Sequence, residues 1–199
     1  ARGVNFREET MGRLIRFVSS HEVGHTLGLP HNFASSHAYP VDSLRSATFT
    51  KEFGTAPSIM DYARFNYIAQ PGDANVSLMP DVGPYDKYSI AWGYRPILEA
   101  KTPEEEQPTL DKWILAKQGD PVYRFGRQGN SYDPSSQSED LGDDAMKASD
   151  YGIKNLKIIL PNLAKWTAEE DKPFKDYSDL NEMYGQVIGQ YNRYMGHIR

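Results

Sequence analysis

The chain has 199 residues, of which 39% are hydrophobic and 25% are charged, and its formal net charge is −5. This size and composition fit a folded domain, alone or with an appendage, rather than a disordered chain. The mild negative charge gives no electrostatic reason to expect binding to nucleic acid or to an anionic membrane. Because the chain contains no cysteine, disulfides and thiolate metal sites are excluded, and any metal must be held by histidines and carboxylates.

The sequence shows neither a membrane-spanning run nor a signal peptide at its start. No apolar run reaches the ~18 residues of a membrane-spanning helix, and no basic-then-apolar leader opens the chain. The opening run, Ala1 to Asn5, reads like the interior of a protein. We therefore expect the sequence to be a piece of a longer parent chain.

The first predicted element is a helix over residues 7–29. Apolar side chains recur there at the three- and four-residue spacing of one helix face. Gly28 and then Pro30 predict its end. Residues 30–83 are rich in Ser, Pro, Asn and Gly, so we expect mostly loop with short turns.

Four further helices are predicted from capping signals and apolar periodicity. The clearest start is Thr102 followed by Pro103 and acidic residues, which combines an N-cap, a first-turn proline and favourable charges. Strand signals are weak, so the visible chain should be mainly α with long loops. The four predicted helices cover residues 84–93, 102–119 and 144–159, and the last begins near residue 178. Pro161 is expected to break or kink the third of them.

Residues 21–31 contain the strongest motif, His-Glu-Val-Gly-His-Thr-Leu-Gly-Leu-Pro-His. His21 and His25 are four residues apart, so on a helix they share one face and can bind one ion. Gly28 allows a sharp turn because glycine readily takes positive φ, and the turn returns His31 as a third ligand. Three protein ligands leave the fourth position of a zinc ion open, which is typical of a catalytic site.

Glu22 is the predicted general base of this site. It is rotated by ~100° from His21 around the helix axis, which places it beside the metal. Zinc lowers the pKa of its water to about 7, and Glu22 could take that proton and deliver it to a leaving amine. With 5 His and 16 Gly in the chain, a chance match to the pattern is on the order of one in 10⁵.

The pattern resembles the metzincin clan of zinc endopeptidases, whose helix motif is HExxHxxGxxH. The clan also has a methionine turn below the metal, and residues 58–62 here read Ser-Ile-Met-Asp-Tyr. The resemblance implies that Met60 forms a hydrophobic floor under the histidines. It also implies that Tyr62 stands near the zinc, as a ligand in the free enzyme or as a hydrogen-bond donor to the oxyanion. The expected substrate is a protein or peptide.

More closely, the chain resembles a group of large bacterial zinc-dependent metalloproteases, in which the catalytic part follows a secretion signal and a long N-terminal region. The runs HEVGHTLGLPHN, PSIMDYARFNYIAQPGD and GPYDKYSIAWGYR carry this likeness. The resemblance implies a bacterial, extracytoplasmic location: periplasmic, surface-anchored or secreted. It also implies a catalytic core over residues 1–96, with a helical C-terminal subdomain over 97–199 packed on it.

Two features depart from the better-known clan members. The residue after the third histidine is Asn32, where those members have an acidic residue, Pro or Ser. Metzincins are α+β proteins with a mixed sheet before the active-site helix, and its edge strand binds substrate. Only 20 residues precede His21, so we expect the N-terminal part of the parent to complete the cleft.

Two alternatives remain open from the sequence. The chain could be a non-catalytic fragment whose zinc site is structural or idle because the sheet is absent. It could also be a thermolysin-like enzyme with a glutamate as third ligand, for which Glu52 lies at a possible distance.

Several other residues are weaker candidates. His37 could be a surplus ligand but fits a solvated loop better, and His197 has no evident role. Asp61 could hydrogen-bond a ligand histidine or could be an ordinary turn residue. The acidic stretch 133–144 does not match an EF-hand loop, and we expect a solvated loop with a helix start. Most aromatic residues should serve packing.

Overall fold

The computed structural model describes residues 6–63, 65–127, 133–168 and 176–198. The opening run, Ala1 to Asn5, from which we expect a longer parent chain, lies outside these ranges. All regular secondary structure in the described ranges is helical, without strands, so the predicted mainly α class with long loops is confirmed. None of the helices in these ranges combines the length and apolar character needed to cross a membrane.

Seven α-helices and four short 3₁₀ segments make up the described elements. In chain order they are α1 (Glu8–Thr26), η1 (Ser36–Ala38), η2 (Ser43–Arg45), α2 (Ala47–Phe53), α3 (Pro84–Tyr94), α4 (Pro103–Leu115), η3 (Pro121–Tyr123), α5 (Ala145–Ile159), η4 (Leu160–Asn162), α6 (Leu163–Trp166) and α7 (Ser178–Gly196).

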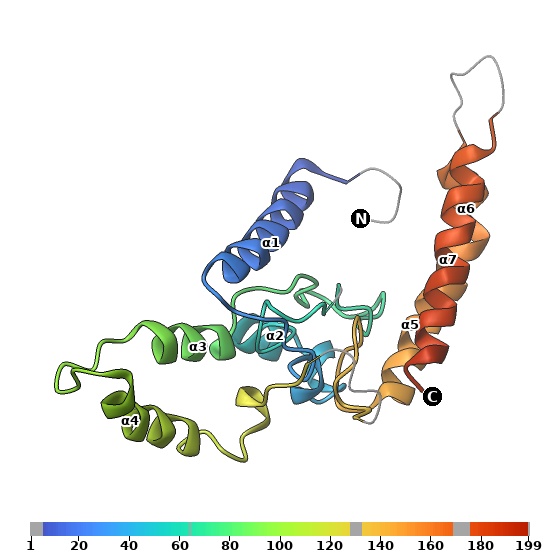
Figure 1. The fold of residues 1–199 in the computed structure, drawn as a ribbon. Coiled ribbons are helices and arrows are strands. Elements are labelled where there is room, and N and C mark those ends of the chain that lie inside the picture. The colour runs from blue at the N-terminus through green and yellow to red at the C-terminus, as the bar shows by residue number, and fades with distance from the viewer. Residues whose placement is uncertain (1–5, 64, 128–132, 169–175, 199) are drawn as a thin grey trace.

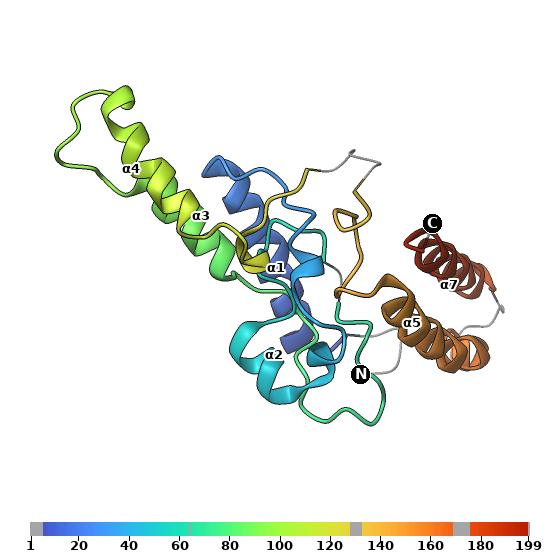
Figure 2. The ribbon, with the colours of Figure 1, turned by 90° about the horizontal axis from the view of Figure 1, so that it is seen from below.

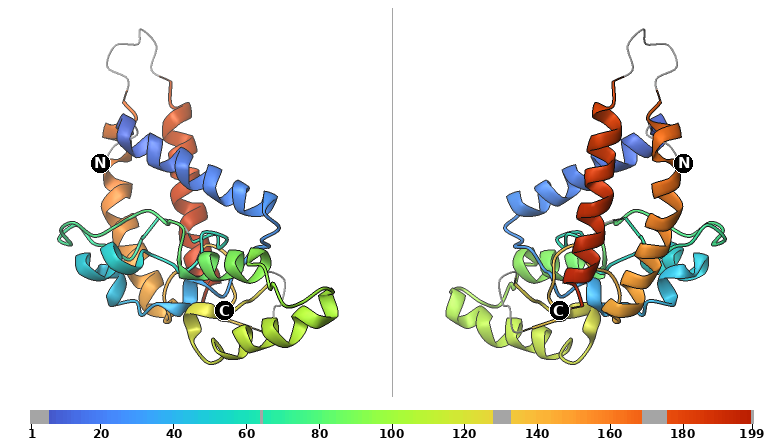
Figure 3. Two further views of the ribbon diagram at one scale, coloured as in Figure 1. Left: turned by 90° about the vertical axis from the view of Figure 1, so that its left-hand side faces the viewer. Right: turned by 90° about the vertical axis from the view of Figure 1, so that its right-hand side faces the viewer.

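The helices surround a body that is built mostly from loops. Figure 1 shows α3 and α4 at one end of the molecule. At the other end, α5 continues into α6 to form one long rod, and α7 packs antiparallel against it. The side views in Figure 3 show α5 and α7 running side by side. The short elements between residues 30 and 83 fill the middle, and the view in Figure 2 places α2 beside this loop body.

Most predicted helix starts agree with the observed caps. The Thr102 hydroxyl accepts the Glu105 N–H ahead of Pro103, and the Asp144 carboxylate accepts the Lys147 N–H at the start of α5. After α5 the chain kinks at Pro161 through η4 into α6 rather than stopping.

Residues 30–83 are mostly loop with short turns, as predicted, but the prediction did not include one helix. The seven-residue helix α2 lies there, and the Ser46 hydroxyl caps it by accepting the Phe49 N–H. The helix is stabilised by packing as well as by its cap, since the Phe49 ring contacts the Tyr39 ring edge-on at 5.1 Å between centroids. Such a short helix depends on tertiary contacts, which periodicity cannot reveal.

The main cluster of buried apolar residues lies in the loop body and against α5. Its buried members come from residues 39–68 and from the segment that enters α5. A close-packed core at this place holds the loops as fixed structures. The buried core residues are Tyr39, Val41, Leu44, Ala56, Ala63, Ile68, Leu141 and Ala148.

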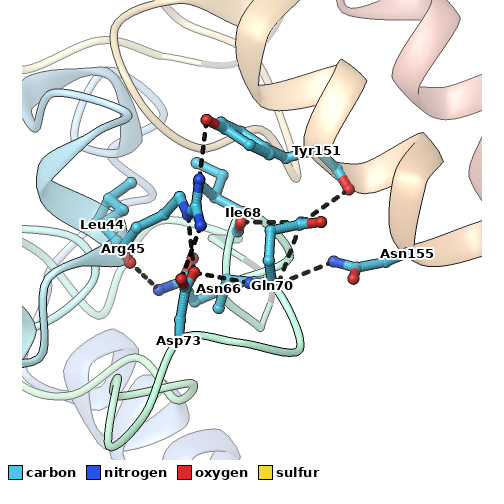
Figure 4. Close-up of polar contacts among 9 residues, drawn as sticks. Leu44, Arg45, Asn66, Ile68, Gln70, Asp73, Tyr151 and Asn155 are labelled. Carbon is cyan, nitrogen blue, oxygen red and sulfur yellow. Dashed lines mark hydrogen bonds and ion pairs between the residues drawn. The ribbon is translucent and has the colours of Figure 1, made fainter.

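A polar cluster ties the loop that follows residue 62 to α5 (Figure 4). The Arg45 guanidinium donates two hydrogen bonds to the Asp73 carboxylate, at 2.8 and 2.7 Å, and a third to the Tyr151 hydroxyl at 3.0 Å. Gln70 donates to the Tyr151 carbonyl, and Asn155 donates to two carbonyls of the same loop. Bidentate arginine–carboxylate pairs have defined geometry, so this cluster fixes the loop against α5.

The N-terminal helix α1 is exposed along much of its length. Only His21 and Gly24 are buried in it, and apolar residues predicted to face a core, such as Ile15 at 60% and Val18 at 53%, are open to solvent. The helix is held to the body by Arg16, which pairs with Asp81 at 2.7 Å, and by contacts near its C-terminus.

Candidate metal centre

Three histidine rings meet at the C-terminal end of α1. His21 and His25 lie one turn apart on the helix, and His31 returns from the loop that follows. The Nε2 atom of His31 is 3.2 Å from that of His21 and 3.0 Å from that of His25. Among the described residues, these three form the one group of metal-ligating side chains whose ligand atoms converge, all within 4.8 Å of one another.

The other ring nitrogens of the two helical histidines are occupied by backbone carbonyls. His21 Nδ1 lies 2.7 Å from the Ile59 oxygen, and His25 Nδ1 lies 2.9 Å from the Leu29 oxygen. A carbonyl can only accept, so each Nδ1 must carry a proton, and in the neutral ring the Nε2 atom then presents a lone pair. This arrangement is common for metal-ligating histidines, because it fixes the tautomer and the ring orientation.

The converging lone pairs fit a metal ion. His31 Nε2 lies 3.0–3.2 Å from each of the other two Nε2 atoms, and lone pairs on nitrogens this close repel one another unless a cation or a proton lies between them. A tetrahedral zinc with bonds of ~2.0–2.1 Å separates its ligand nitrogens by ~3.3 Å, close to the distances from His31 Nε2 to the other two Nε2 atoms. Burial lowers the pKa of His31, and His25 and His21 lower it further, which favours the neutral form that binds metal.

Glu22 lies beside this group on the exposed side of α1. Its negative charge acts on His31, where it opposes the lowering of the pKa. The side chain is open to solvent.

Two glycines shape the end of α1. Gly28 has φ of +83°, and a Cβ there would meet nothing within 4 Å, so the backbone conformation rather than space requires glycine. Gly24 is different, because a Cβ there would lie 2.3 Å from the sulfur of Met60. Met60 is fully buried and lies directly against the helix between His21 and His25.

Tyr62 closes one side of the histidine group. Its ring centroid is 4.4 Å from that of His31 and 5.3 Å from that of His21, on which it stacks at 22°. The side chain is 39% exposed, so it is a wall of the site rather than a core residue. Phe33 packs on both Tyr62 and His31 from the buried side.

A family model described as Met-zincin matches residues 3–199. The chain belongs to the Met-zincin family. No match was found among curated proteins or among solved structures. Membership implies zinc as the metal, in agreement with the converging histidines.

In this Met-zincin, Asn32 holds the third-histidine loop against a distant segment. Its amide donates to the Arg124 carbonyl at 2.9 Å and accepts the Gly126 N–H at 3.0 Å. The neighbouring Phe33 N–H donates to the Gly126 carbonyl at 2.8 Å. An asparagine fits this place because it offers a donor and an acceptor together, which an aspartate cannot do.

Other candidates from the sequence lie outside the histidine group. His37 and the exposed Glu52 are not among the converging side chains. The third potential ligand atom therefore comes from His31 rather than from Glu52. His197 bonds the Ser138 carbonyl instead. Asp61 is fully buried and accepts the Ser36 N–H at 2.6 Å, so it is a structural residue of the turn.

The expectation that the acidic stretch 133–144 is a solvated loop was wrong for part of it. Asp140 is buried and accepts the Ser36 hydroxyl at 2.9 Å, and Asp143 accepts the Val41 N–H at 3.0 Å. The two partners of each bond are more than 100 residues apart in the sequence, so nothing in the local sequence indicated these bonds.

Two buried residues next to the methionine turn were not among our sequence candidates. Asp86 and Ser58 are 3% and 0% exposed and bond each other at 2.5 Å. The available hint was the run Gly83-Pro84-Tyr85-Asp86, which has the spacing of a helix start whose third residue bonds back to the N-cap N–H.

Proposed function

We propose that the chain is the catalytic core of a zinc endopeptidase that hydrolyses peptide bonds in proteins or peptides, with Glu22 as general base and acid. The observation that carries the proposal is the convergence of three histidine Nε2 atoms, two of them with Nδ1 held by a carbonyl, beside an exposed glutamate. Three protein ligands leave a coordination position for water or substrate.

When bound, zinc lowers the pKa of a coordinated water to about 7 and polarises the carbonyl of a bound peptide. Glu22 takes the proton of the attacking water on a carboxylate oxygen and later delivers it to the leaving amine nitrogen. The Tyr62 hydroxyl would ligate the metal in the free enzyme or would donate a hydrogen bond to the carbonyl oxygen as that oxygen gains negative charge. The position of its ring against His21 and His31 supports this role.

We further propose that a part of the parent chain outside this sequence completes the cleft above the histidines. The exposed apolar residues of α1 support this, since contiguous exposed apolar surface on a soluble protein often marks an interface. A bacterial, extracytoplasmic location of the parent remains a proposal that rests on the resemblance of the motif runs alone.

Cleavage of an unfolded protein substrate by the zinc-loaded chain tests the proposal. Glu22→Gln should lower turnover by about 10²–10⁴-fold, the usual contribution of general acid–base catalysis, while the zinc content stays unchanged. Tyr62→Phe should also retain zinc and lose part of the turnover. Equal activity of wild type and Glu22→Gln would contradict the assigned base.

A non-catalytic zinc-binding fragment is the second candidate, and the solvent-exposed face of α1 favours it. In that case the wild-type chain binds zinc but cleaves nothing. Cleavage that appears only when the preceding part of the parent chain is included would support the proposal that this part completes the cleft.

A further inference from the structure

A chain of hydrogen bonds connects His21 to a carboxylate that does not touch it. His21 Nδ1 donates to the Ile59 carbonyl at 2.7 Å. The Met60 N–H, which belongs to the same peptide group as that carbonyl, donates to the Ser58 hydroxyl oxygen at 3.0 Å. The Ser58 hydroxyl in turn donates to Asp86 Oδ1 at 2.5 Å.

The direction of every bond in this chain is determined. A backbone N–H can only donate, so Ser58 Oγ accepts from Met60 and its single proton is free for Asp86. A backbone carbonyl can only accept, so the proton between His21 and Ile59 belongs to the imidazole. All donors therefore point in one sense, from the ring to the carboxylate.

Asp86 is placed as an acceptor on both oxygens. Oδ1 receives the Ser58 hydroxyl, and Oδ2 receives the N–H groups of Ile59 and Gly83, both at 2.8 Å. Burial raises the pKa of Asp86, but these three donors and the nearby His21 oppose the rise. With every contact a donor, the geometry suits the ionised carboxylate.

The whole chain is shielded from water, so its electrostatic effects are not screened by solvent. Gly83 makes this close packing possible, since a Cβ there would lie 1.9 Å from the Pro57 carbonyl oxygen. The buried members and their exposed fractions are His21 at 4%, Ser58 at 0%, Ile59 at 3%, Met60 at 0% and Asp86 at 3%.

The second helical ligand offers an internal contrast. His25 Nδ1 also bonds a carbonyl, that of Leu29. The residue after Leu29 is Pro30, so this peptide group has no N–H through which a further acceptor could polarise it. A connection of this kind can therefore exist for His21 but not for His25.

We propose that Asp86 is a positioning residue for the metal centre, whose negative charge acts through Ser58 and the Ile59–Met60 peptide group to fix the tautomer of His21 and to make its Nε2 a stronger ligand. Hydrogen bonds in such a chain polarise one another in the same sense. A carbonyl or carboxylate behind a ligand histidine raises its basicity, and here the peptide group connects the two. The inference rests on the metal site and not on peptidase activity.

Two variants interrupt the chain in different ways. Ser58→Ala removes the link but keeps the bonds of Asp86 to Ile59 and Gly83, so the start of α3 should remain intact. Asp86→Asn removes the charge and turns a donor toward Ser58. Asp61→Asn is the control, because it makes the same Asp-to-Asn substitution at a buried carboxylate of the same turn, one that accepts the Ser36 N–H and lies outside the chain of hydrogen bonds to His21.

Affinity for Zn²⁺ and Co²⁺, measured by competition with a chelator, is the first readout. Loss of a group behind a ligand typically lowers metal affinity 10–100-fold, and we expect a loss in this range for Ser58→Ala and Asp86→Asn but not for Asp61→Asn. Unchanged affinity in the first two variants, or an equal loss in the control, would overturn the proposal.

The imidazole ¹⁵N shifts of the metal-free chain are the second readout. Those of His21 should move in Ser58→Ala while those of His25 stay in place. Equal shifts of both rings, or of neither, would contradict the proposal even if the wild type bound no metal. A wild type without metal affinity would instead defeat the proposed function, so the two failures are distinguishable.

Discussion

At the scale of single residues, the contact between Gly24 and Met60 explains why the histidine motif and the methionine turn occur together. The sulfur of Met60 occupies the space that a side chain at position 24 would need. Methionine suits such a gap because its side chain is unbranched and its sulfur is polarisable. The helix can therefore lie close enough to the turn for His21 to reach the Ile59 carbonyl.

Gly24→Ala should consequently destabilise the folded chain. Overpacking a closed site usually costs about 1–3 kcal/mol, and the metal affinity should fall as well because Met60 must move. Gly12→Ala is the control on the same helix, where a Cβ meets nothing within 4 Å. It should be neutral or raise the free energy of unfolding by about 0.5–1 kcal/mol. Denaturant unfolding of both variants measures this, and equal effects would contradict the close contact.

At the scale of elements, Ser36 joins two buried carboxylates that come from distant parts of the chain. Its N–H donates to Asp61 and its hydroxyl donates to Asp140. Burial raises the pKa of Asp140 to about 7, and burial together with the charge of Asp140 raises the pKa of Asp61 well above its usual value. The junction between the methionine turn and the segment before α5 is therefore sensitive to pH.

The sign of this dependence follows from the raised pKa of Asp140. In the unfolded chain this carboxyl ionises near pH 4, whereas in the folded chain it keeps its proton up to about pH 7. Folding therefore binds a proton in this window, so stability is greatest below it and falls as the pH rises through it. Asp140→Asn should remove this part of the loss, as measured by denaturant unfolding at several pH values between 4 and 8. An identical pH profile for wild type and variant would contradict the assignment.

Several helix starts and the metal centre could be predicted from the sequence. The starts of α3, α4 and α5 followed from local signals, namely Pro84, the Thr102–Pro103 pair and Asp144. The histidine spacing likewise led to the metal centre, because a helix places such residues on one face. Helix α2 did not follow, since seven residues give too short a pattern and its packing comes from Tyr39.

Hydrogen bonds between residues far apart in the chain could not be predicted from the sequence. The roles of Asp86, Asn32 and Asp140 depend on partners 27 to 104 residues away. Each carries an ordinary polar side chain that is usually solvated, so only the folded arrangement distinguishes it from its neighbours.

At the scale of the whole molecule, the core and the metal centre are displaced from one another. The hydrophobic core lies beneath the loop body and α5, while α1 brings two of the three ligands from an exposed helix. Figure 1 shows α1 standing away from the rods formed by α5 and α7. Stability of the centre therefore depends on the few contacts at the C-terminal end of α1.

The exposed apolar face of α1 should make the isolated chain prone to self-association. Replacing Ile15 and Val18, which are 60% and 53% exposed, with glutamate should lower the apparent mass measured by light scattering. Zinc content should be measured in parallel, because Val18 lies one helical turn before His21 and Glu22. Self-association that persists in the double variant would show that a different surface is responsible.

The zinc content of the purified chain, determined by elemental analysis after dialysis against metal-free buffer, tests the central claim most directly. We expect about one zinc per chain in the wild type, as a site with three protein ligands holds a single ion, and a clear loss in His31→Ala. Folded wild-type protein that neither contains zinc nor takes it up, or His31→Ala protein that retains the full amount, would contradict the three-histidine centre.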